Sequence, residues 1–331
     1  MSFWTDKKVL LTGATGFLGG WLTRRLLTDG ADIVAIVRQS RPLSQFALEG
    51  FDRRVRVRPG AAEDPATIAA AFAADAFDGV FHLAAMADVN AALRDPPAAM
   101  RASIDSTLLI LEQLRHTRPD AVAVIASSDK AYGAQPLPFR EDLPLHPRHP
   151  YEIAKATQDL LAQSYGRLFG LKVAVTRCGN FFGGYDFAFE RIVPHTIRQI
   201  LRGEAPVLRS DGRFTRDFLH VEAAAEATLL LAERLAADAS VRGQAFNFSH
   251  EVEIPVIDLV CRIADIMGSA LRPRIAATAT AEIRRMRLDT AKARTMLGWQ
   301  PTVDFAEGLR RTVAWYAEHL GAFERRGLLG R

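Results

Sequence analysis

The chain has 331 residues, of which 49% are hydrophobic and 24% are charged, as is usual for a globular protein with one large or two modest domains. A net charge of +4 spread over scattered basic residues gives no indication of a nucleic-acid partner. Residues 1–8 show no apolar signal region, and no segment reaches the roughly 20 apolar residues of a membrane span, so we expect a cytoplasmic protein with no membrane contact. Cys178 and Cys261 lack metal-site spacing, so we expect neither a metal nor a disulfide.

The chain opens with an apolar strand at 9–11, a glycine-rich turn and a helix that ends at Gly30. In this context the spacing Gly-x-x-Gly-x-x-Gly is typical of a turn that binds a dinucleotide pyrophosphate at a helix N-terminus. The first glycine allows the tight turn, the second a close approach of backbone to phosphate, and the third close packing of helix on strand. A purely structural tight turn is the alternative. The residues predicted to bind the cofactor here are Gly13, Thr15, Gly16, Phe17, Leu18 and Gly19.

The second strand, predicted at 33–37, ends at Arg38 instead of the acidic residue that commonly binds the adenosine ribose. A guanidinium suits a 2′-phosphate, so we expect NADP to be slightly favoured over NAD; stacking of Arg38 on adenine, with NAD bound, is the alternative. The fourth strand, at 79–83, runs into Leu83, Ala84 and Ala85, where small residues let the backbone pass close to the cofactor.

Strands and helices alternate through this half of the chain, with a long helix predicted at 97–115. The pattern predicts an α/β protein with a Rossmann-type, doubly wound parallel sheet. From residue 186 the elements become shorter, which indicates a smaller mixed α/β second domain. We assign residues 1–180 to the dinucleotide-binding domain, with a helix and a strand returning to it from about 215–250, and residues 181–331 mostly to the second domain.

The stretch 127–155 carries the candidate chemistry. A buried strand at 121–126 leads to Ser128, and Tyr151 and Lys155 are four residues apart, so they share one face of a helix predicted at 151–169. An ammonium held near a phenol lowers the pKa of the phenol, which makes a base that works near neutral pH. Ser128 can share the substrate oxygen with Tyr151. The alternative is an amphipathic helix with a solvated lysine.

Together with the glycine-rich turn, these residues resemble the extended short-chain dehydrogenase/reductase family, the nucleotide-sugar epimerases and dehydratases, over nearly the whole chain. The resemblance implies NAD(P), contacted also by Tyr151 and Lys155, and oxidation of a sugar hydroxyl whose proton Tyr151 takes. Asp129 and Lys130 distinguish members of the family, because 4,6-dehydratases carry an acid–base pair at these positions. The string Ser-Asp-Lys-Ala-Tyr looks most like the CDP-glucose type.

The resemblance therefore implies a nucleotide-sugar 4,6-dehydratase. Oxidation at C4 acidifies the C5 hydrogen, which Lys130 would remove while Asp129 protonates the departing C6 hydroxyl. Adjacent residues face opposite ways on a strand, so the strand must end in a turn for both to reach the sugar. A surface salt bridge between them is the alternative. The predicted catalytic residues are Ser128, Asp129, Lys130, Tyr151 and Lys155.

The second half of the chain supplies the substrate contacts that the resemblance implies, with a nucleotide-diphosphate sugar as partner. Asn180 would donate to its pyrophosphate and Arg216 would clamp a phosphate. Amphipathic helices near 93–114 and 153–168 would, by the same resemblance, pair in a homodimer. A solvated face is the alternative for any single arginine. The predicted substrate-binding residues are Asn180, Arg191, Val207, Arg216, Asn247 and Arg284.

Two other functions fit the sequence. A 4-epimerase acting on a UDP-hexose needs only Ser128, Tyr151 and Lys155, and an NAD(P)-binding sensor or scaffold needs only the dinucleotide fold. The sequence leaves the nucleotide base and the sugar open.

Overall fold

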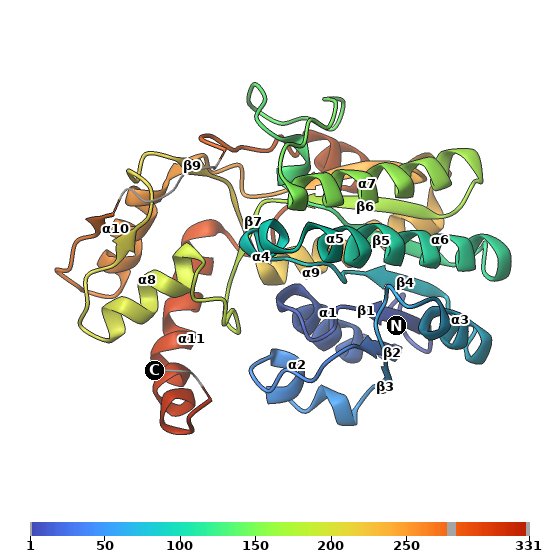
Figure 1. The fold of residues 1–331 in the computed structure, drawn as a ribbon, viewed down its shortest axis with the longest axis horizontal. Coiled ribbons are helices and arrows are strands. Elements are labelled where there is room, and N and C mark those ends of the chain that lie inside the picture. The colour runs from blue at the N-terminus through green and yellow to red at the C-terminus, as the bar shows by residue number, and fades with distance from the viewer. Residues whose placement is uncertain (1, 277–282, 329–331) are drawn as a thin grey trace.

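The computed structural model describes residues 2–276 and 283–328 (Figure 1). Seven strands form one sheet in the order β11-β6-β5-β4-β1-β2-β3, and every pairing in it is parallel. The predicted α/β fold with a doubly wound parallel sheet is confirmed. The strands are β1 (Lys8–Thr12), β2 (Asp32–Val37), β3 (Arg56–Pro59), β4 (Gly79–His82), β5 (Val122–Ala126), β6 (Val173–Cys178) and β11 (Ala245–Phe248).

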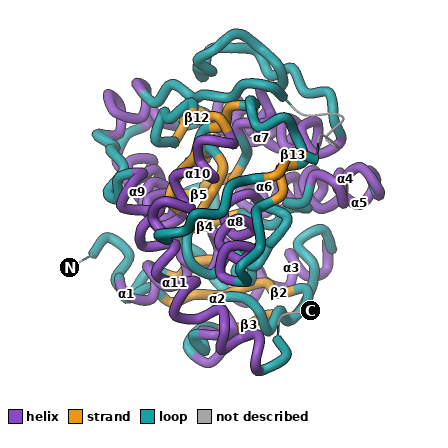
Figure 2. Tube along the Cα trace, turned by 90° about the vertical axis from the view of Figure 1, so that its left-hand side faces the viewer, coloured by secondary structure: helices purple, strands orange, loops and turns teal. Residues whose placement is uncertain are grey.

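Helices cover both faces of the sheet, which is why its central strands are apolar throughout. On one face, Leu22 and Leu231 join Val9 in one buried cluster, and on the other face Ile68 and Leu111 join Leu10 in a second. Figure 2 shows the two helical layers on either side of the strands. The first layer is α1 (Phe17–Thr28) and α9 (Val221–Ala237), and the second is α3 (Pro65–Ala74), α6 (Ser106–Thr117) and α7 (Pro150–Leu168).

The helix predicted at 97–115 is interrupted in the structure. It consists of α5 (Pro96–Met100), a π-helical turn at Arg101–Asp105, and α6. The hydroxyl of Thr107 donates to the Ser103 carbonyl at 2.6 Å, and such back-bonding accompanies local changes of helical pitch. The same hydroxyl accepts a hydrogen bond from Gln158 of α7 at 2.8 Å, so the π turn is tied to the helix that carries Tyr151 and Lys155.

A second group of elements packs at one end of the sheet (Figure 1). Its core includes Ile197, Leu259 and Tyr316. Helix α9 and strand β11, which lie within residues 215–250, return to the seven-stranded sheet. The domain boundary at residue 180 stays a prediction. No helix in the described ranges is long and apolar enough to cross a membrane. The remaining elements are α2 (Gln45–Leu48), α4 (Val89–Arg94), α8 (Ile192–Leu201), α10 (Val256–Ile266), α11 (Phe305–Arg325), β7 (Asn180–Phe182), β8 (Val207–Leu208), β9 (Thr215–Arg216), β10 (Phe218–His220), β12 (Ile254–Pro255) and β13 (Arg274–Ile275).

Candidate active site

The carboxyl ends of β1 and β4 lie side by side where the strand order reverses, the position at which doubly wound sheets bind ligands. Gly13 has φ +76°, and a Cβ added to it would lie 2.9 Å from the backbone nitrogen of Ala84. A Cβ on Gly19 would lie 2.0 Å from the Gly13 carbonyl oxygen. Both positions therefore require glycine, and the turn after β1 lies against the segment after β4.

The start of α1 fits a dinucleotide pyrophosphate. Gly16 is its N-cap and provides no side-chain cap, and the first turn contains no acidic residue. The N–H groups of the first turn, which have no carbonyl partner within the helix, and the positive end of the helix dipole therefore favour an anion there. Thr15, Phe17 and Leu18 lie in the turn or open the helix, and Leu83 and Ala85 flank Ala84.

Arg38 follows β2 with a side chain that is 60% exposed, and its Nη1 lies 2.9 Å from Oε1 of Glu63. The guanidinium predicted to meet a 2′-phosphate thus already has a carboxylate beside it.

The strand before Asp129 ends as the dehydratase hypothesis requires. β5 stops at Ala126, and a 3₁₀ turn, Asp129–Tyr132, follows; we call it the Asp129 turn. Ser128 caps this turn, because its Oγ accepts a hydrogen bond from the Lys130 backbone nitrogen at 3.2 Å. The turn lets the side chains of Asp129 and Lys130 point the same way, so that Asp129 Oδ1 lies 3.7 Å from Lys130 Nζ.

Asp129 is buried, which distinguishes this pair from a surface salt bridge. The residue is 1% exposed, and its Oδ1 accepts a hydrogen bond from Ser128 Oγ at 3.0 Å. Its Oδ2 has no hydrogen-bond partner within the described part of the chain. A buried oxygen without a partner is costly unless a ligand atom pairs with it, so this position fits a polar group of a substrate.

The Lys130 side chain is held by residues of a strand pair outside the seven-stranded sheet. Its Nζ donates to Asn180 Oδ1 at 3.0 Å, and Asn180 Nδ2 donates to the Asp217 carbonyl at 3.0 Å. The strands β7 and β10, which pair in parallel, therefore fix the amine beside Asp129. Asn180, predicted to contact the substrate pyrophosphate, lies next to the Asp129 turn.

Lys155 lies inside the protein on the first turns of α7. It is 4% exposed, and its Nζ donates to the Ala126 carbonyl at 2.6 Å and to Gln158 Oε1 at 2.9 Å. Burial lowers the pKa of the Lys155 ammonium to about 8, although the charge of Asp159 acts in the opposite direction.

The pKa of Tyr151 corrects one expectation. Burial raises this pKa, a hydrogen bond with Ser128 only partly offsets the effect, and the charge of Asp129 raises it further. The Lys155 amine is held by Ala126 and Gln158 and does not lower the pKa of the phenol. In this structure the prediction that it does so is therefore wrong. Ser128 and Asp129 are both near enough to Tyr151 to act on its phenol, so the three residues lie close together.

Sequence reasoning missed two residues that support this site. Gln158 links the Lys155 amine to Thr107 of α6, and its spacing of three residues from Lys155 could have indicated the contact. Asp217, 0% exposed, accepts from the backbone nitrogens of Phe218 and Leu288, both at 2.9 Å, and burial raises its pKa to about 7. The sequence contained no local signal for this role.

The predicted substrate-binding residues fall in different places. Arg191, the N-cap of α8, lies 3.3 Å from Asp186 and is near enough to Tyr151 for its charge to act on the phenol. Arg216 in β9 donates to the Thr215 and Ile283 carbonyls at 2.9 and 2.7 Å. Arg284 is exposed, and its carbonyl accepts a hydrogen bond from the backbone nitrogen of Thr215 at 2.9 Å. Val207 of β8 pairs with Arg274 of β13.

Asn247 requires a correction. It is 0% exposed, its Nδ2 donates to the carbonyls of Phe139 at 2.9 Å and Asp289 at 3.1 Å, and its Oδ1 accepts from the Tyr132 hydroxyl at 2.8 Å. Both amide protons and one lone pair of the oxygen are used inside the protein, and a fully buried side chain is not open to a substrate. In this structure Asn247 therefore supports the protein interior and not the proposed substrate site.

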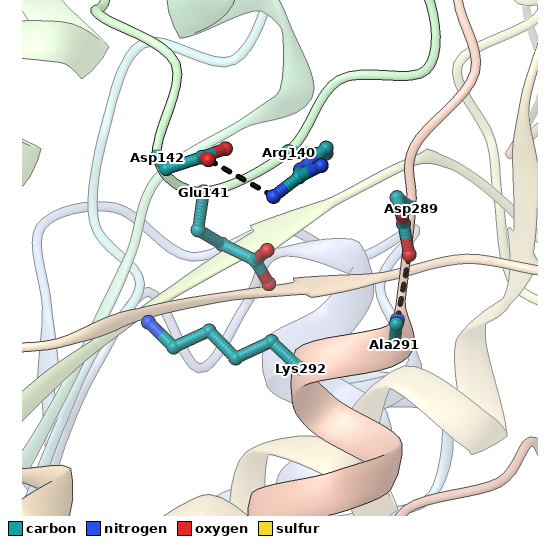
Figure 3. A pocket seen from close by; sticks show the side chains of 6 residues that line it. All are labelled: Arg140, Glu141, Asp142, Asp289, Ala291 and Lys292. Atoms are coloured by element: carbon teal, nitrogen blue, oxygen red, sulfur yellow. Dashed lines mark hydrogen bonds and ion pairs between the residues drawn. The ribbon is translucent and has the colours of Figure 1, made fainter.

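A cavity of about 510 Å³ lies beside Asn247 and contains none of the predicted site residues (Figure 3). Its charged groups pair with one another or with backbone: Arg140 with Asp142 at 3.0 Å, and Lys292 with the Ala245 carbonyl at 2.8 Å. Glu141 accepts from the backbone nitrogen of Asn247 at 2.8 Å. The lining residues are Arg140, Glu141, Asp142, Asp289, Ala291 and Lys292.

Comparison with known proteins identifies the family. The chain matches the GDP-mannose 4,6-dehydratase family over residues 10–312. It belongs to this family. Membership agrees with the resemblance to extended short-chain dehydrogenases/reductases, and a family of nucleotide-sugar 4,6-dehydratases and 4-epimerases accounts for both the glycine-rich turn and the Tyr151–Lys155 pair.

Individual relatives include both activities. A dTDP-glucose 4,6-dehydratase from Streptomyces antibioticus is 32% identical over 327 residues, which cover 96% of this chain and 94% of that protein. A UDP-glucose 4-epimerase from Mycolicibacterium smegmatis is 29% identical over 315 residues, covering 93% and 98%. These relatives are enzymes, and both are similar to the chain over nearly its whole length.

Solved structures give the same result. A UDP-glucose 4-epimerase from Thermotoga maritima, solved with UDP-glucose, matches with a TM-score of 0.87 at 26% identity, covering 95% of this chain and 99% of that one. A dTDP-glucose 4,6-dehydratase from Streptomyces venezuelae, solved with NAD, matches with a TM-score of 0.84 at 26% identity, covering 96% and 99%.

Proposed function

We propose that this protein is a nucleotide-sugar 4,6-dehydratase that forms a 4-keto-6-deoxy sugar. The Asp129 turn carries the proposal, because it places a buried carboxyl group and an amine 3.7 Å apart beside Ser128 and Tyr151. An epimerase that only oxidises and reduces C4 has no use for this pair. The string Ser-Asp-Lys-Ala-Tyr favours a CDP-glucose-type substrate.

The residues that would hold NAD(P) are those of the crevice between β1 and β4. Gly13, Gly16 and Gly19 would face the pyrophosphate, and Ala84 would line the path of the cofactor. A nicotinamide bound there would supply the hydride acceptor for C4 of the sugar and the hydride donor for C6. We propose that Tyr151 and Lys155 lie at the nicotinamide end of the site.

The protein's own side chains move the protons. The deprotonated form of Tyr151 takes the proton of the C4 hydroxyl, and Ser128, which lies beside the phenol, shares the same oxygen. Lys130 removes the C5 proton and Asp129 donates a proton to the C6 hydroxyl, which leaves as water. The proton on Lys130 returns to C5 when C6 is reduced, and exchange with solvent transfers the proton gained by Tyr151 back to Asp129. Because the hydride removed from C4 is the one delivered to C6, the reaction needs no external reductant.

The test is incubation of the protein with CDP-, UDP-, GDP- and dTDP-glucose, with products identified by mass spectrometry and NMR. We expect a product lighter by one water, most rapidly from CDP-glucose. Lys130→Ala and Asp129→Asn should each lower its rate by about 10²- to 10⁴-fold, the usual contribution of a general acid or base. Lys172→Ala, which removes a lysine paired with the exposed Asp120, is the matched control. A C4 epimer as the only product, formed equally well by both variants, would identify the protein as an epimerase.

We propose that the site accepts both NADP and NAD, with NADP favoured through Arg38. The preference should be less than about tenfold, because an exposed guanidinium already paired with Glu63 adds only about 1 kcal/mol. Arg38→Ala should weaken NADP binding, measured by calorimetry, and leave NAD binding unchanged. Equal losses for both cofactors would contradict a role at the 2′-phosphate.

We propose a homodimer that forms through α6 and α7. Leu108 of α6 is 40% exposed, and Ile153 and Leu160, seven residues apart on one face of α7, are 38% and 56% exposed. Leu160→Asp should yield a monomer in analytical ultracentrifugation. Leu201→Asp on α8, where the leucine is 42% exposed, is the control that should leave the dimer intact.

We also propose a location in the cytoplasm, because Cys178 and Cys261 are both free thiols, as a reducing compartment would keep them. Fractionation of cells that produce the protein tests this.

A further inference from the structure

The proposed reaction requires two sets of groups to meet one sugar. Tyr151 and Lys155 lie on α7, whereas Asp129 and Lys130 lie on the Asp129 turn, which follows β5. The first set acts at C4 and the second at C5 and C6, so a shift of the turn relative to α7 would separate the two steps. Misplacement by about 1 Å can lower a rate by 10²-fold.

A buried ion pair connects α7 to the sheet. Asp159, one helical turn beyond Lys155, is 0% exposed, and Arg177 of β6 is 2% exposed. Arg177 Nε donates to Asp159 Oδ2 at 2.7 Å and Nη2 donates to Oδ1 at 2.9 Å. This two-point contact fixes the plane of the guanidinium.

The remaining Nη of Arg177 continues the connection to the Asp129 turn. Nη1 donates to the hydroxyl of Tyr132 at 2.8 Å, and Tyr132 is the last residue of that turn. The guanidinium carbon also lies 4.8 Å from the centre of the Tyr132 ring. A continuous set of contacts thus runs from the helix of Tyr151 and Lys155 to the turn of Asp129 and Lys130.

Tyr132 is fixed on its other side as well. Its hydroxyl donates to Asn247 Oδ1 at 2.8 Å, and its ring stacks on Phe139 with centres 5.1 Å apart. The hydroxyl therefore accepts one hydrogen bond and donates another, which leaves its orientation no freedom. The residue is 0% exposed, so water cannot replace either partner.

We infer that Asp159, Arg177 and Tyr132 form a positioning network that holds the Asp129 turn in register with α7, so that the acid–amine pair and Tyr151 act on the same sugar. The effect of the network on catalysis rests on the proposed dehydratase function, whereas its effect on the position of the Asp129 turn does not. Hydrophobic residues can often replace a buried ion pair with little loss of stability, which agrees with a role in orientation rather than in stability alone. The Asp159 charge also favours the ammonium form of Lys155.

Tyr132→Phe tests the network, because it removes one oxygen and keeps the ring against Phe139. Tyr165→Phe is the matched control. It also removes a tyrosine hydroxyl, but Tyr165 lies on α7 and its hydroxyl contacts Glu112 at 2.5 Å and not the Asp129 turn. The first measurement is hydrogen–deuterium exchange of the peptide covering 127–133, which needs no substrate. The second is the steady-state rate of water elimination from the nucleotide-glucose that the wild type accepts.

We expect exchange in the 127–133 peptide to become at least about tenfold faster in Tyr132→Phe and to stay unchanged in Tyr165→Phe. The kcat for elimination should fall about 10- to 100-fold with KM within about twofold, because the turn is misplaced while Tyr132 is not itself one of the proposed substrate-binding residues. If Tyr132→Phe fails to fold, Arg177→Lys provides the same measurements, since it keeps the positive charge but cannot bond Asp159 twice and Tyr132 as well.

The outcomes separate the two proposals. Unchanged exchange in a folded Tyr132→Phe or Arg177→Lys protein would overturn the positioning network, whatever the enzyme catalyses. Faster exchange in a protein whose wild type eliminates no water would overturn the dehydratase proposal and leave the network standing. Faster exchange with kcat unchanged would show that the network does not set the catalytic geometry, and so would also overturn the inference.

Discussion

Asp159→Asn is expected to destabilise the protein strongly. The substitution keeps the size and shape of the side chain, so it opens no cavity, but it leaves the charge of Arg177 buried without its counter-charge. Arg177 and Asp159 are 2% and 0% exposed, so neither solvent nor salt can compensate. Removal of one partner from such a pair costs about 3–5 kcal/mol, a large part of the 5–15 kcal/mol that stabilises a typical domain.

The assay is urea unfolding followed by circular dichroism, and Asp29→Asn is the control. Asp29 also pairs with an arginine, Arg25, at 3.1 Å, but on the surface, where the arginine side chain is 47% exposed. Loss of that pair should cost less than about 1 kcal/mol. The double variant Asp159→Leu/Arg177→Met should recover much of the lost stability, because it leaves no buried charge. Equal, small shifts of the urea midpoint for Asp159→Asn and Asp29→Asn would refute the reasoning.

Two further results are expected. The free energy of unfolding of the wild type should rise relative to that of Lys155→Met by about 3 kcal/mol between pH 8 and pH 10.5. The reason is that the folded-state pKa of Lys155, about 8, lies below the ordinary 10.5, so the unfolded chain binds more protons in this range. Urea titrations that give parallel curves for the two proteins across this range would contradict a buried ammonium. Gly19→Ala should abolish cofactor binding, measured by nicotinamide fluorescence, because its Cβ would lie 2.0 Å from the Gly13 carbonyl oxygen. The control, Gly321→Ala in α11, should bind normally, because the nearest atom to its Cβ is the end of the Arg325 side chain at 3.3 Å. Normal binding by Gly19→Ala would contradict this prediction and show that the turn can open.

Much of the site could be predicted because its signals are local. The glycine spacing after β1 and the four-residue spacing of Tyr151 and Lys155 are both read within one turn of chain, where backbone geometry decides which residues meet. The requirement that the strand end before Asp129 also follows from the alternation of side chains along a strand. The structure meets it with the 3₁₀ turn that Ser128 caps.

Other features depend on contacts that no local pattern contains. The sequence placed Lys155 beside the phenol of Tyr151, but its amine bonds to Ala126 and Gln158, and burial then raises the pKa of Tyr151. Asn247 was expected to meet substrate, yet its partner Tyr132 lies 115 positions earlier in the chain.

The sequence by itself determined the parallel sheet and the glycine-rich turn, because each follows from spacing along a strand or helix, and the family resemblance supplied the side chains proposed to react. Only the tertiary structure decided which of those side chains are buried and what each one bonds to. Burial and pairing depend on segments that are distant in the chain and meet only when the sheet, α7 and the Asp129 turn pack together.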